Sequence, residues 1–179
     1  MRKSDSYVIA LGGILTAVSI TIMFMGSMIP FATFAVPAMA SLTVLFFVME
    51  LSKTTAFIVY LSISILSLLL VSDREVTFLF AFFFGHYPIL KALFENLKRK
   101  ILEYLLKFSV FNISIISAYF LMLKIFGFEA IVKEFADYKT AFLLLLLVLG
   151  NVTFFVYDIA LTRLIILYIR LIRPKLKRR

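Results

Sequence analysis

The sequence has no cysteine and a single histidine among its 179 residues. Without cysteine, the chain forms no disulfide bonds and offers no thiolate ligands to a metal. One histidine is too few for a metal site built from several imidazoles. Charged residues are also scarce, at 16% of the chain, whereas a soluble domain has about 25%. These absences exclude the common metal and disulfide chemistries.

Several motifs of catalysis and nucleotide binding are missing as well. The sequence contains no G-x-x-x-x-G-K-[ST] phosphate loop, no G-x-S-x-G and no H-E-x-x-H. It has no pair of carboxylates placed for acid and base chemistry. We therefore expect no enzyme activity, no cofactor and no metal, and any step driven by ATP would need a different subunit.

Apolar residues dominate what is present. They make up 63% of the chain, and the mean hydropathy is +1.07. These values indicate an integral membrane protein. The formal net charge of +9 would suggest nucleic acid in a soluble protein. Here the basic residues flank apolar segments, so they are better explained by topology and by contact with anionic lipid headgroups, with no nucleic-acid partner.

The hydropathy pattern predicts an all-α integral membrane protein, a compact bundle of six transmembrane helices in a single domain spanning 1–179. A spanning helix needs about 20 mostly apolar residues. The expected helices cover about 7–28, 35–51, 54–71, 76–94, 105–126 and 140–168. The segment 127–139 has the spacing of a short interfacial helix that would act as a lid, and 170–179 is a basic C-terminal tail.

The distribution of Lys and Arg predicts that both termini are cytoplasmic. In that orientation, the outer side receives only a few of the 19 basic residues, namely Arg74, Lys124, Lys133 and Lys139. An even number of spans places both ends of the chain on the same side, so the helix count and the charge bias agree.

Polar residues inside apolar helices are costly and tend to face the interior of a bundle. A few of them in an apolar cavity are typical of a small-molecule site. The candidate solute site joins the fourth, fifth and sixth helices and their outer mouth: Arg74, Glu75, His86, Tyr87, Tyr119, Asn151 and Phe155. Structural roles remain open for some polar residues. His86 could be a hydrogen-bonded interior histidine, and Asp158 could pair with Lys91 or Arg163.

The only histidine lies in the stretch FFFGHYPILK, residues 82–91. Pro88 cannot donate a backbone hydrogen bond and crowds the carbonyl of Phe84, so this stretch predicts a kink in the fourth helix. Gly85 in the same turn permits a close approach of another segment.

The first helix carries a stripe of small residues, Ala10, Gly13 and Ala17, within ALGGILTAVS. Such a stripe lets another helix approach closely. It could pack against helices of the same chain or dock a partner protein.

With six predicted helices, cytoplasmic ends, this small-residue stripe and the uncharged first outer loop GSMIPFATF, the chain resembles the substrate-binding S component of energy-coupling factor (ECF) transporters. The resemblance implies that a vitamin or related micronutrient is captured from outside, in a pocket of helices four to six covered by outer loops. It also implies docking, through the first helix, on a membrane coupling subunit driven by two ATPases. The location would be a prokaryotic plasma membrane.

A membrane scaffold or assembly protein of similar size is the alternative hypothesis. It would expose small-residue and basic surfaces to its partners and would have no pocket opening outward. A polar-lined cavity among helices four to six would favour transport, and a packed centre would favour the scaffold.

Overall fold

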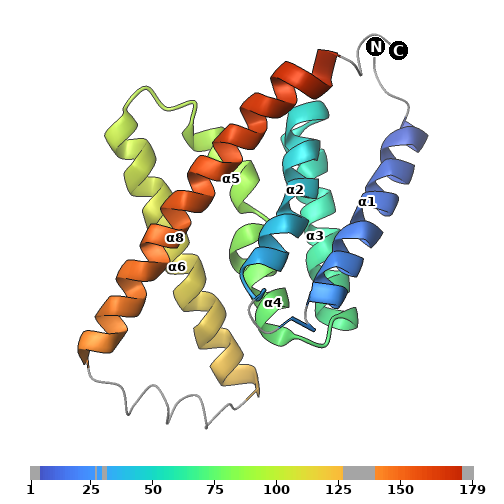
Figure 1. The fold of residues 1–179 in the computed structure, drawn as a ribbon. Coiled ribbons are helices and arrows are strands. Elements are labelled where there is room, and N and C mark those ends of the chain that lie inside the picture. The colour runs from blue at the N-terminus through green and yellow to red at the C-terminus, as the bar shows by residue number, and fades with distance from the viewer. Residues whose placement is uncertain (1–4, 27, 30–31, 127–139, 175–179) are drawn as a thin grey trace. The chain divides into compact units, whose positions relative to one another are not determined.

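The computed structural model describes residues 5–26, 28–29, 32–126 and 140–174, and these residues are almost entirely helical, with no strand among them (Figure 1). The chain divides into two compact units, Met1–Glu129 and Ala130–Arg179. The all-helical part of the predicted fold class is therefore confirmed for the described residues.

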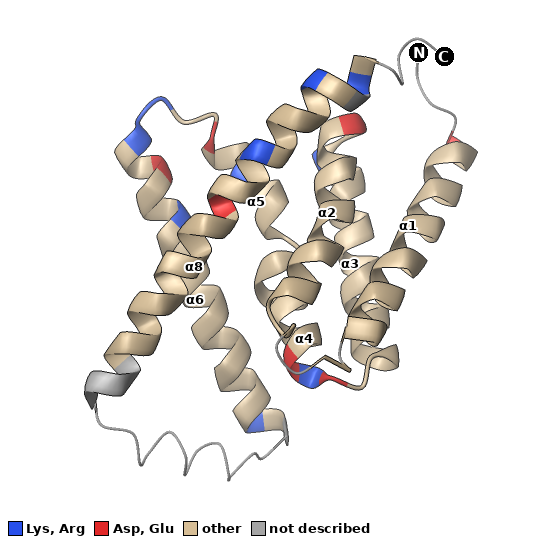
Figure 2. Ribbon diagram, in the orientation of Figure 1, with Lys and Arg blue, Asp and Glu red and all other residues tan. Residues whose placement is uncertain are grey.

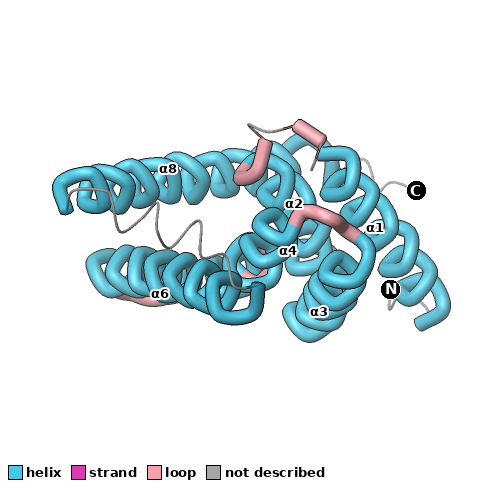
Figure 3. The backbone as a smooth tube through the Cα atoms, turned by 90° about the horizontal axis from the view of Figure 1, so that it is seen from below, coloured by secondary structure: helices cyan, strands magenta, loops and turns pink. Residues whose placement is uncertain are grey.

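The first unit contains seven consecutive helical segments in its described part. They are α1 (Asp5–Gly26), α2 (Ala35–Glu50), α3 (Lys53–Leu70), α4 (Arg74–Leu79), the π-helical turn η1 (Phe80–Phe84), α5 (Tyr87–Phe94) and α6 (Lys100–Phe126). Helices α1, α2 and α3 pack against one another. The view along the helices places α4 beside α2 and α3, and α4 also contacts α6 (Figure 3).

The segment from α4 through η1 to α5 forms the core of this unit. In its most apolar stretch, 67% of the residues are buried, compared with 17% for α1 and 28% for α3. Its surroundings explain this burial, since α2, α3 and α6 all contact it. The predicted fourth helix, 76–94, is thus present, but as three segments rather than one.

Five helices of the described chain are long and apolar enough to cross a membrane. They are Asp5–Gly26, Lys53–Leu70, Arg74–Phe94, Lys100–Ile125 and Leu144–Leu171. Helix α2 has 16 residues, fewer than the about 20 that a perpendicular span needs. The structure thus supports a membrane-embedded protein with five candidate spans, while the sixth span and the cytoplasmic termini remain predictions. Most charged residues of the first unit lie near helix ends, as expected for membrane spans, whereas Lys107 lies further inside α6 (Figure 2).

The described part of the second unit contains a long helix, α8 (Thr140–Leu167), which continues into the π-helical turn η2 (Tyr168–Ile172). This agrees with the predicted sixth helix at 140–168. The predicted lid at 127–139 and residues 175–179 of the basic tail lie outside the described residues.

Short polar caps separate α3 and α4 from the helices before them. Ser52 precedes α3, and its hydroxyl accepts a hydrogen bond from the backbone N–H of Thr55 at 3.1 Å. Asp73 caps α4 in the same way, accepting from the N–H of Val76 at 3.2 Å. Each cap satisfies a backbone donor that the first helical turn leaves unpaired.

The stretch around the histidine is irregular, but not in the way that Pro88 alone predicts. The irregularity begins earlier, at η1, where the N–H of Gly85 donates to the carbonyl of Phe80 at 2.8 Å. This bond spans five residues instead of the four of an α-helix. Pro88 lies in the first turn of α5, where a missing N–H leaves no hydrogen bond unmade.

Gly85 is packed so closely that no other residue fits its position. A Cβ atom there would lie 2.6 Å from Cδ2 of Tyr60 and 2.9 Å from the carbonyl oxygen of Phe80. Gly13 gives the opposite case, because a Cβ atom there would have no neighbour within 4 Å.

We expect Gly85→Ala to destabilise the protein by about 1–3 kcal/mol, the usual cost of overpacking a core. Gly13→Ala is the matched control and should leave stability unchanged or slightly raised, because alanine favours helix. Thermal unfolding in detergent, followed by circular dichroism, measures both. Equal melting temperatures for the two variants would contradict the close packing at Gly85.

Candidate functional site

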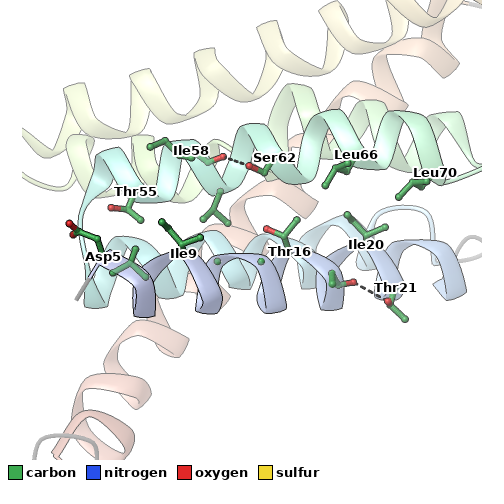
Figure 4. A pocket seen from close by; sticks show the side chains of 15 residues that line it. Asp5, Ile9, Thr16, Ile20, Thr21, Thr55, Ile58, Ser62, Leu66 and Leu70 are labelled. Atoms are coloured by element: carbon green, nitrogen blue, oxygen red, sulfur yellow. Dashed lines mark hydrogen bonds between the residues drawn. The ribbon is translucent and has the colours of Figure 1, made fainter. Parts of the chain in front are cut away.

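A long groove runs between α1 and α3 in the first unit (Figure 4). Its volume is about 830 Å³. Most of its lining is aliphatic, with Ile9 and Ile20 on α1 and Ile58, Leu66 and Leu70 on α3. Asp5 and Thr55 lie together at one end (Figure 4). The groove therefore follows nearly the full length of two candidate membrane spans.

The small-residue stripe faces outward along this groove. Ala10, Gly13 and Ala17 are all exposed, and Gly13 and Ala17 line the groove, whereas Ala10 does not. Gly12 instead packs against α3 within the first unit, since a Cβ atom there would lie 3.7 Å from the side chain of Val59. The sequence left two roles open for the stripe, packing against helices of the same chain and docking of a partner. The exposure of Gly13 and Ala17 fits a contact with a segment or molecule outside the first unit.

Two hydroxyl groups along the groove, those of Thr21 and Ser62, are satisfied by their own helices. Thr21 donates to the carbonyl of Ala17 at 2.9 Å, and Ser62 donates to the carbonyl of Ile58 at 2.9 Å. An apolar helix could therefore cover these hydroxyls without leaving them unpaired.

The structure brings together two of the predicted solute-site residues, Glu75 and Tyr119. The hydroxyl of Tyr119 on α6 donates to Oε1 of Glu75 on α4 at 2.5 Å. Side chains that surround this contact are apolar: Phe78, Leu79, Ala118 and Met122. They leave no room for a water molecule, so the predicted cavity is closed at this point.

Arg74 adjoins Glu75 in sequence, and its guanidinium reaches back to α3. It donates to the carbonyl of Leu68 at 2.6 Å. This bond satisfies one of the carbonyls that the end of α3 leaves unpaired. The geometry gives Arg74 a structural role at the turn between α3 and α4.

His86 and Tyr87 contact other neighbours. The ring of His86 lies 5.8 Å from that of Tyr60. Tyr87 is fully buried, and its ring lies 5.0 Å from that of Phe83. Both residues thus belong to the packing around η1, in line with the interior role considered for His86.

Asn151 and Phe155 lie on α8 in the second unit. The amide of Asn151 donates to the carbonyl of Leu147 at 2.8 Å within the helix. Thr162, one turn after Asp158, donates to the carbonyl of Asp158 at 3.0 Å. These bonds satisfy polar groups within the helix itself.

A network of charged residues between α5 and α6 was not predicted as a site. Lys91 pairs with Glu95 at 2.7 Å, and Lys107 pairs with Glu103 at 2.9 Å and with Glu95 at 3.5 Å. Lys100 completes the network, 2.8 Å from Glu103. The side chains of Lys91 and Lys107 are only 1% and 2% exposed. Spacings of four residues, at 91/95 and 103/107, were the available signal.

Comparison of the chain with protein-family models, with curated proteins and with solved structures finds no match. The features of the structure that bear on function are therefore the groove, the Glu75–Tyr119 contact and the charge network.

We expect Glu103→Gln to destabilise the protein by about 3 kcal/mol, because it removes the closest carboxylate from a buried lysine, Lys107. Lys100→Gln is the control. Its side chain is 73% exposed, so its loss should cost less than about 1 kcal/mol. Melting temperatures in detergent compare the two variants. A control that destabilises as much as Glu103→Gln would show that burial does not govern the network.

Proposed function

We propose that this chain is the solute-binding subunit of an ECF-type importer driven by ATP. In this role it captures a vitamin or related micronutrient outside a prokaryotic plasma membrane and docks on a separate coupling subunit that works with two ATPases. The observation that carries the proposal is the open groove between α1 and α3, which exposes Gly13 and Ala17 along two candidate membrane spans.

Helix association in a membrane explains why this groove supports docking. Lipid tails are as apolar as leucine, so helices associate through close packing rather than through the hydrophobic effect. Glycine and alanine allow the closest approach of a second backbone. Since Gly13 has no neighbour within 4 Å of a Cβ position, a side chain from a partner helix has room to insert there.

The Glu75–Tyr119 contact supports the solute-binding part of the proposal. It places a carboxylate and a phenol among apolar side chains between two helices, which is the usual composition of a small-molecule site. A solute would have to separate α4 from α6 locally and replace the hydrogen bond of Tyr119. Binding and opening of this contact would therefore be coupled.

The docking surface is tested by Gly13→Leu. Leucine at this position would fill the groove, so assembly with the coupling subunit and ATPases in a co-purification experiment should fall by more than about tenfold. Ala10→Leu adds the same side chain to the same helix outside the groove and should assemble normally. Normal assembly of Gly13→Leu would reject the groove as the docking surface.

Solute binding is tested by Glu75→Ala. Native mass spectrometry of the purified protein, with a panel of vitamins, should show a bound solute for the parent and about tenfold weaker binding for the variant, since a charged hydrogen-bonding group is lost. Tyr104→Phe on α6 removes an exposed hydroxyl and should bind as the parent does. Equal affinity of the parent and Glu75→Ala would show that the solute site lies elsewhere.

One observation favours the second candidate, a membrane scaffold that carries no solute. The Glu75–Tyr119 contact is closed and leaves no space even for water. In a scaffold it would serve only to join α4 and α6, and the groove would hold a structural partner. Failure of the parent to bind any vitamin, together with normal docking through the groove, would favour this function over transport.

A further inference from the structure

The π-helical turn η1 holds one residue more than an α-helical turn would. Its defining bond runs from the N–H of Gly85 to the carbonyl of Phe80. In an α-helix this N–H would donate to the carbonyl of Ala81, four residues back. In the π turn, the carbonyl of Ala81 therefore does not receive the hydrogen bond from Gly85 that it would accept in an α-helix.

The carbonyl of Ala81 receives its hydrogen bond from another helix instead. The hydroxyl of Tyr60, in the middle of α3, donates to it at 2.7 Å. The ring of Tyr60 lies against this turn, 5.8 Å from the ring of His86 and 6.4 Å from that of Phe80. Tyr60 thus replaces the donor that the π geometry removes.

This replacement matters because α4 precedes the π turn directly. Each residue turns an α-helix by about 100°. If η1 became α-helical, its extra residue would be absorbed into the regular helix, and α4 would rotate against α5 by about that angle. Val76 would then take the place of Glu75, and Leu79 the place of Phe78. Contacts of α4 with α6, including the hydrogen bond from Tyr119 to Glu75, depend on the present register.

We propose that Tyr60 is a positioning residue that sets the rotational register of α4, and hence the meeting of Glu75 with Tyr119, by holding η1 in its π form. Without its hydroxyl, the carbonyl of Ala81 loses a donor in an apolar environment, where an unpaired carbonyl is costly. In an α-helix the donor to Ala81 is the N–H of Gly85, and a switch of this N–H from Phe80 to Ala81 converts the turn to α. This inference is independent of whether a solute binds.

Cross-linking between α4 and α6 tests the proposal. The chain has no native cysteine, so the pair Phe78→Cys and Met122→Cys reports this contact alone. Adding Tyr60→Phe should lower the initial cross-linking rate by about fivefold, the factor expected for one hydrogen bond.

Two controls separate a change of register from general loosening. Ser62→Ala removes another hydroxyl of α3, one bonded only within its own helix, and should leave the rate unchanged. A second reporter pair, Gly12→Cys with Val59→Cys, joins α1 to α3, and its rate should not respond to Tyr60→Phe. An unchanged Phe78–Met122 rate in the Tyr60→Phe variant, or an equal fall in both reporter pairs, would overturn the proposal.

Discussion

The structure depends on the requirement that every backbone N–H and C=O within a membrane finds its partner inside the protein. This requirement explains why the described chain is helical, and why irregular backbone occurs where side chains can complete its hydrogen bonds. Tyr60 does so for Ala81, and Arg74 does so for Leu68. In both places a polar side chain of a neighbouring segment supplies a donor, so the irregularity also joins two segments.

Hydropathy and the positions of polar residues each predict a different part of the structure. Hydropathy located α1, α3 and α8 within a few residues, because a long apolar segment leaves few alternatives. It also located α2, predicted at 35–51 and found at Ala35–Glu50, although these 16 residues are fewer than a perpendicular span needs. Glu75 and Tyr119 were predicted to share a site because polar residues in apolar helices tend to meet, yet their closed contact depends on packing that composition does not encode. The π turn was not predicted, because the hydrogen bond that stabilises it comes from Tyr60, which lies 21 positions from Ala81 in the sequence.

The first unit offers two surfaces of different character. The groove between α1 and α3 is open and mostly aliphatic, and the hydroxyls of Thr21 and Ser62 in it are already satisfied, so it would suit a lasting contact with another helix. The Glu75–Tyr119 contact is closed and polar at its centre, so a ligand must compete with an existing hydrogen bond. Because α3 forms one wall of the groove and also carries Tyr60, a partner seated in the groove would touch the same helix that holds η1.

The charge network between α5 and α6 has a consequence for how the chain enters the membrane. If the termini are cytoplasmic as predicted, Lys91 and Lys107 would contribute to the positive charge that retains this hairpin in the cytoplasm during insertion. In the folded protein the same ammonium groups are hidden and matched by Glu95 and Glu103. In the predicted orientation the two lysines would act first as topology signals during insertion and later as buried charges paired with glutamates. Basic residues that orient a nascent chain need not remain on its surface.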